Sequence, residues 1–242
     1  MKSTNAAQRL YKILNDAKAQ KPNGSSQQAL AGIFKTHPDD LATLYSKFSQ
    51  FLLLIEDVNI RIQALDSTDK EVILRCIPQL RKAFGSDFSM QGQWNQYIAR
   101  IGDSDIGLVH FAAKALDGVS TEIELEESKL SEILKETNDL FEVVKSSDLD
   151  PELRIVLLDL LEAIRRTIVD YQIRGAEGLK RVLSECLGRL ALDKDIVIQN
   201  GQKDEMKSFW TLLSRLSTLF GLANQAPQIG ERIGNLITMI KG

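Results

Sequence analysis

The segment Asp148-Leu-Asp-Pro-Glu152 separates two long helical patterns and decides the fold class of this 242-residue chain. Asp150 is a good N-cap because its carboxylate can accept a hydrogen bond from an unpaired N–H group of the following turn. Pro151 suits the first helical position because its missing N–H would have had no partner there. The segment therefore predicts a long helical hairpin, about residues 121–173, at the centre of an all-α, irregular multi-helix bundle.

Apolar residues recur every three or four positions on both sides of this turn, as expected for two amphipathic helices. They are Leu130, Ile133, Leu134, Leu140, Phe141 and Val144 before the turn, and Leu153, Leu157, Leu160, Leu161, Ile164 and Ile168 after it. This spacing favours antiparallel packing at a shallow crossing angle.

The flanking sequence is also predominantly helical, and we expect three regions. These are an N-terminal helical region (1–118), the hairpin with the following helix (119–192) and a C-terminal amphipathic helical hairpin (203–242), packed as one cooperative unit or as two close subdomains. Within the first region, Pro78 should kink a helix over 68–84 or split it near Ile77, and Gly85 should end it in a left-handed conformation. Residues 191–205 contain turn signals and predict a loop.

Composition predicts a soluble globular protein. The chain is 43% hydrophobic and 26% charged, and its formal net charge of −3 supplies no positive field that would attract nucleic acid, so no nucleic-acid partner is expected. Cys76 and Cys186 lie within apolar helical patterns and should be buried thiols, which fits a reducing cytoplasm. We find neither a secretory signal nor a run of about eighteen apolar residues, so we expect a cytoplasmic location.

Catalytic and cofactor motifs are not apparent, and we expect no cofactor and no metal. The tetrapeptide His37-Pro-Asp-Asp40 resembles the His-Pro-Asp-Asp element of zinc-dependent deacetylases that act on N-acetylated sugars. In that family the element follows a buried strand and works with a further histidine pair, whereas His110 is the other histidine here and the preceding residues read as helix. Pro38 and the two aspartates instead favour a helix start.

Acidic residues crowd the first helix of the predicted hairpin. Glu126, Glu127, Glu132 and Glu136 are candidate partner-binding residues, because an acidic face steers and orients a basic partner. The alternative is a solvated face whose charges pair within the fold.

The sequence Arg174-Gly-Ala-Glu-Gly178 places two glycines where a helix would otherwise continue. Because each glycine costs about 1 kcal/mol in a helix interior, they indicate a joint between helices or a close approach of two backbones. With Arg174, Gly175, Gly178 and Arg181, the joint is a candidate anion site, since exposed N–H groups and arginines favour phosphate. Nearby acidic residues favour local salt bridges instead.

These features predict a non-enzymatic helical scaffold, adaptor or regulator that binds a protein partner or itself through the charged long helices. One alternative is an effector of a bacterial defence or toxin-type system whose C-terminal hairpin, with apolar stripes through Phe209 and Ile233, contacts a membrane. The other is a hydrolase with an unrecognised site near His37 or His110.

Overall fold

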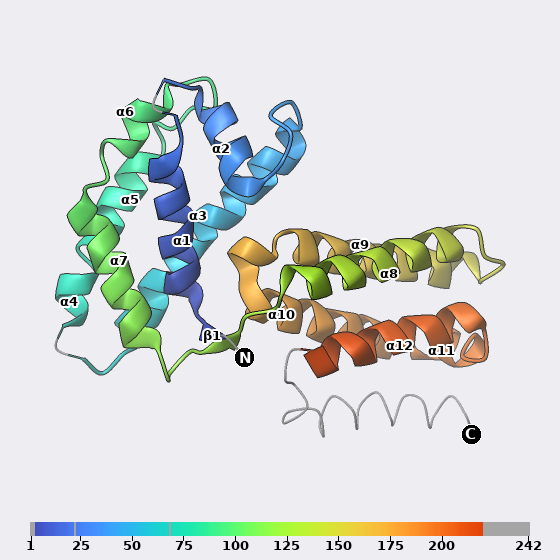
Figure 1. Ribbon diagram of the computed structural model, residues 1–242. Coiled ribbons are helices and arrows are strands. Elements are labelled where there is room, and N and C mark those ends of the chain that lie inside the picture. The colour runs from blue at the N-terminus through green and yellow to red at the C-terminus, as the bar shows by residue number, and fades with distance from the viewer. Residues whose placement is uncertain (1–2, 22, 68, 220–242) are drawn as a thin grey trace. The chain divides into compact units, whose positions relative to one another are not determined.

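The computed structural model describes residues 3–21, 23–67 and 69–219, and it confirms the all-α multi-helix fold (Figure 1). The chain divides into two compact units, with the division between Glu122 and Ile123. We call residues 3–122 the N-terminal unit and the described residues from 123 onward the C-terminal unit. The three regions expected from the sequence stay a prediction.

The N-terminal unit combines one long helix, α3, with several shorter ones. Its elements are β1 (Ser3–Thr4), α1 (Ala6–Ala19), α2 (Ser26–Phe34), α3 (Leu41–Gln63), α4 (Lys70–Ile73), α5 (Cys76–Phe84), α6 (Trp94–Ile98) and α7 (Asp103–Leu116), and β2 (Glu122–Ile123) pairs with β1. Helix α1 packs against α3 and α7. The centre of the unit is aromatic: Phe51 and Phe84 meet edge to face with ring centroids 5.0 Å apart, and Trp94 is fully buried.

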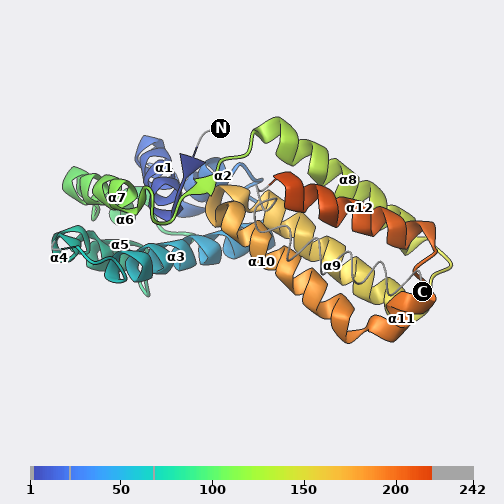
Figure 2. The same cartoon turned by 90° about the horizontal axis from the view of Figure 1, so that it is seen from below.

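Long helices make up the C-terminal unit, which consists of α8 (Glu127–Lys145), α9 (Pro151–Val169), α10 (Tyr171–Leu192), α11 (Lys194–Gln199) and α12 (Asp204–Leu219). Helices α8 and α9 form the predicted hairpin, α10 packs on α9, and α12 packs on α8 (Figure 2). The Asp150 carboxylate accepts a hydrogen bond from the N–H of Glu152 at 2.9 Å, and Pro151 is the first residue of α9, as the sequence predicted. The core is mainly aliphatic, with Leu153, Leu157 and Leu161 fully buried.

The start of the hairpin was predicted too early. Residues 122 and 123 form β2 rather than helix, and α8 begins at Glu127. The physical reason is a long-range interaction: Glu122 is buried and forms an ion pair with Arg9 at 2.7 Å, next to the short β1–β2 pairing. The local helical pattern could not reveal that Glu122 has an ion-pair partner so far away in the sequence.

The helix expected over 68–84 is split close to the predicted position, at Leu74 and Arg75, so Pro78 lies in the first turn of α5, where its missing N–H leaves no helical hydrogen bond unmade. The prediction for Gly85 was wrong. Gly85 ends α5 with φ −84°, not in the left-handed conformation.

The segment expected as a loop over 191–205 contains a helix, α11. Val197 of this helix is fully buried against the core of the C-terminal unit. Burial of this side chain outweighs the turn signals on either side, because local propensity is a weak preference that tertiary packing overrides.

The cysteines are buried free thiols, as predicted. In α12 the apolar stripe belongs to the core: Phe209, Leu213 and Leu216 are fully buried. The second half of the predicted C-terminal hairpin, which contains Ile229 and Ile233, lies outside the described residues. Among the described helices, none combines the length and the apolar character that a membrane span requires.

Candidate functional site

The acidic residues of α8 are largely paired within the C-terminal unit. Arg215 of α12 donates to Glu132 at 2.6 Å and also to Glu136. The hydrogen bond to Glu132 raises the pKa of the Arg215 guanidinium. Glu126 precedes α8 and is exposed, and Glu127 opens the helix. The structure thus joins two of the four candidate glutamates in one network with Arg215, and partner binding by the four stays a prediction.

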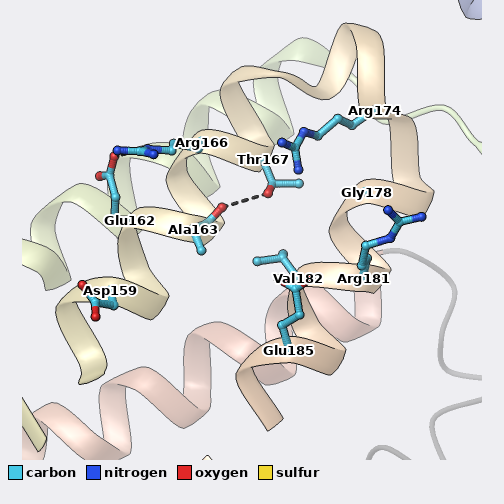
Figure 3. Close-up of a pocket in the computed structure, with 10 residues that line it drawn as sticks. All are labelled: Asp159, Glu162, Ala163, Arg166, Thr167, Arg174, Gly178, Arg181, Val182 and Glu185. Atoms are coloured by element: carbon cyan, nitrogen blue, oxygen red, sulfur yellow. Dashed lines mark hydrogen bonds and ion pairs between the residues drawn. The ribbon is translucent and has the colours of Figure 1, made fainter. Parts of the chain in front are cut away.

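A groove of about 360 Å³ lies between α9 and α10 (Figure 3). We refer to it as the α9–α10 groove. It is lined by Asp159, Glu162, Ala163, Arg166 and Thr167 of α9 and by Arg174, Gly178, Arg181, Val182 and Glu185 of α10. The groove therefore contains three of the four residues of the predicted anion site.

The fourth residue of that site, Gly175, shapes the groove instead of lining it. Its φ of 63° and ψ of −165° interrupt the helical backbone of α10, in a region that is accessible essentially to glycine alone. The joint predicted from the glycine pair is therefore present, at Gly175. It turns the first residues of α10 away from the rest of the helix.

Gly178 has a steric role. A Cβ atom at this position would lie 2.5 Å from the Cβ of Arg174, closer than real side chains approach. The missing side chain lets the aliphatic part of Arg174 lie across α10 at the groove. The close approach considered for this glycine is therefore with a side chain, not with a second helix.

The arginines of the groove differ in how they are paired. Glu162 forms ion pairs with Arg165 and Arg166, each at 2.6 Å. Arg174 lies 3.8 Å from Asp170, and its Nε is buried without a hydrogen-bond acceptor. Arg181 is exposed and forms no ion pair within the part of the chain that the structure describes. Arg174 and Arg181 are therefore the arginines least compensated by neighbouring carboxylates.

The other end of the groove is acidic. Figure 3 shows Asp159 and Glu185 at the end opposite to Arg174 and Thr167. Both carboxylates are exposed, and neither forms an ion pair with another described residue. Glu185 and Thr167 were not predicted as site residues, although their spacing along α10 and α9 places them on the same helical faces as Arg181 and Asp159. The groove can therefore bind two opposite charges at once.

The histidines are far from this groove in sequence and make local contacts. His37 is exposed, and its Nδ1 accepts a hydrogen bond from the N–H of Asp39 at 3.2 Å, while Asp40 caps α3 through the N–H of Thr43. The His110 ring contacts the Tyr11 ring at a tilt of 41°, with centroids 4.9 Å apart. The helix-start interpretation of His37-Pro-Asp-Asp40 agrees with the Asp40 cap, although α3 begins at Leu41 and not at Pro38.

Burial raises the pKa of the Cys76 thiol to about 11 and that of Cys186 to about 12. Thiols with such values are protonated at neutral pH and poor nucleophiles. Among the residues that the structure describes, no three His, Cys, Asp or Glu side chains are grouped as metal ligands.

Comparison of the chain with protein-family models, with curated proteins and with solved structures found no match.

Proposed function

We propose that this chain is a non-enzymatic helical interaction protein that docks its partner on the α9–α10 groove. The observation that carries the proposal is the distribution of unpaired charge in the C-terminal unit. Glu132 and Glu136 of α8 are already paired with Arg215, whereas Arg181, Asp159 and Glu185 at the groove have no ion-pair partner among the described residues. A charged partner gains more binding free energy from charges that are not already compensated within the chain.

The order of the charges favours recognition of an oriented partner. An acidic group would lie at Arg174 and Arg181, and a basic group at Asp159 and Glu185. Complementary charges raise the association rate and fix the orientation of a complex more than they raise its affinity. The interaction should therefore weaken as salt is added, because exposed charges are screened within about 10 Å at 0.1 M ionic strength.

The test is affinity capture with the full chain at low salt, followed by measurement of the mass of the captured complex. Arg181→Glu should abolish the complex, because it replaces the unpaired cation of the groove with a carboxylate that repels the acidic group of the partner. Lys180→Glu is the matched control: it makes the same charge change one residue away on α10, at a side chain that does not line the groove.

Charge reversal on α8 separates this proposal from the acidic-face interpretation. If Glu126→Lys with Glu127→Lys abolishes the complex and Arg181→Glu does not, the docking surface is α8 and the groove proposal is wrong.

A further inference from the structure

We infer that the α9–α10 groove binds the same groove of a second copy of this chain, in a two-fold symmetric contact. This inference rests on the proposed function and names the partner. Three features of the groove support it: the order of its charges, their balance, and the exposed apolar side chains that continue its acidic end.

The charge order makes the groove complementary to itself. Arg174 and Arg181 lie toward the Gly175 joint, and Asp159 and Glu185 lie toward the other end. A two-fold axis through a surface brings each residue of one copy opposite a different residue of the other, and the same contact occurs twice. Two grooves facing each other across such an axis would therefore place the basic end of each copy against the acidic end of the other.

The charges that line the groove are balanced. The carboxylates that line the groove are Asp159, Glu162 and Glu185, and the cations are Arg166, Arg174 and Arg181, so 3 − 3 leaves no net charge. The whole chain, by contrast, carries a formal net charge of −3. The groove is thus a place where two copies of an acidic protein can approach without like charges facing each other.

Exposed apolar side chains continue the acidic end of the groove. Ile155 is one helical turn before Asp159 and is 60% exposed, and Leu192 is two turns after Glu185 and is 81% exposed. Residues at these spacings share a helix face with the groove carboxylates. Surface ion pairs alone contribute little to association, and these two side chains are exposed apolar surface beside the groove that a second copy could cover.

The experiment is sedimentation velocity of the full chain at low salt, at protein concentrations up to about 100 µM. Wild type is expected to dimerise, and added salt should raise its dissociation constant roughly tenfold or more. Arg181→Glu makes the unpaired charges of the groove all acidic, and Asp159→Arg with Glu185→Arg makes them all basic. Each variant should sediment as a monomer under conditions in which wild type is a dimer.

An equimolar mixture of these two variants provides the decisive measurement. In the mixed pair both symmetry-related contacts join opposite charges, so the mixture should sediment as a heterodimer although neither variant self-associates. Circular dichroism establishes that each variant is folded, and Lys180→Glu is the control that should dimerise like wild type.

A wild-type chain that stays monomeric, or a mixture that stays monomeric although wild type dimerises, would overturn the inference. The proposed function fails in a different way. If wild type is monomeric but low-salt capture finds another protein whose binding Arg181→Glu abolishes, the proposed function stands and self-association does not.

Discussion

The two units reach a helical fold by different means. In the N-terminal unit, one long helix and several shorter ones converge on large aromatic side chains and on specific long-range polar bonds: Trp94 Nε1 donates to the Ala17 carbonyl at 3.0 Å, and Asn5 donates to the Ala113 carbonyl at 2.9 Å. In the C-terminal unit, long helices pack through periodic leucines, and most ion pairs lie at the surface.

This difference is greatest at the short helices α4, α5 and α6 of the N-terminal unit, which have 4, 9 and 5 residues. A short helix has few turns with which to bury a periodic stripe, so its position must be fixed by a few large or polar contacts. A long helix repeats a modest contact many times. Removal of one contact should therefore cost the N-terminal unit more than the C-terminal unit.

The largest effect is expected at Trp94. Trp94→Ala removes a fully buried side chain and its hydrogen bond to Ala17, and should lower the free energy of unfolding by about 4 kcal/mol. Leu157→Ala, at an equally buried position of α9, should cost about 3 kcal/mol. Denaturant titration, monitored by circular dichroism, measures both losses of stability. An equal or larger loss at Leu157 would contradict the comparison.

The buried ion pair of the N-terminal unit should rank next. The Arg9 and Glu122 side chains are 7% and 4% exposed. Glu122→Ala removes a buried carboxylate 2.7 Å from the Arg9 guanidinium and should cost about 3 kcal/mol. The control is Lys135→Met in α8, where the ion pair with Asp139 is exposed. Loss of this ion pair should leave the free energy of unfolding unchanged within measurement error. Similar denaturation midpoints for the two variants would remove this distinction between the units.

A smaller effect is expected at the one irregular point in α10. Gly175→Ala forces a side chain into a glycine-only backbone conformation and should cost about 2 kcal/mol. Gly188→Ala is the matched variant: it lies in the same helix with open space around its Cα and should stabilise the protein by about 0.5 kcal/mol. Thermal denaturation of the two variants should give shifts of opposite sign. Destabilisation by both would show that α10 is not a regular helix apart from its joint.

The smallest effect is a difference in thiol reactivity between the units. Cys76 begins the nine-residue helix α5, whereas Cys186 lies inside α10, so we expect Cys76 to react several-fold faster with a disulfide reagent at pH 8. Single Cys→Ser variants assign the two rates. Faster reaction of Cys186 would indicate that the long-helix unit opens more readily.

The same thiols give a pH dependence. Their folded pKa values, about 11 and about 12, lie above the value of about 8.5 for an unfolded thiol. The unfolded state therefore loses its thiol protons first, so the contribution of the buried thiols to stability is complete below about pH 8 and falls as the pH rises from the unfolded pKa toward the folded values. Cys76→Ser with Cys186→Ser should reduce this loss of stability between pH 8 and 10, as measured by denaturant titration.

Sequence reasoning succeeded where the governing chemistry is local. Asp150 and Pro151 start α9 because each acts within its own turn, and Gly175 marks a joint because backbone conformation is a property of one residue. It failed where the partner is distant. Glu122 belongs to the N-terminal unit because of Arg9, and α11 forms because Val197 reaches the core.

The candidate site shows the same limit. Arg174, Gly178 and Arg181 could be grouped from the sequence because they share one helix. The acidic end of the groove could not be predicted, because it forms only where α9 packs beside α10. Nor did spacing show that Glu132 and Glu136 are compensated by Arg215, since that arginine lies on another helix.

The sequence by itself thus determined the all-α class, the α8–α9 turn and the glycine joint, because caps, prolines and glycines act on the backbone within a few residues. The tertiary structure alone decided which charges are paired, which are free, and which helices border the groove. The physical reason is that charge pairing depends on distance in space, and only packing brings α9, α10 and α12 to the positions that set those distances.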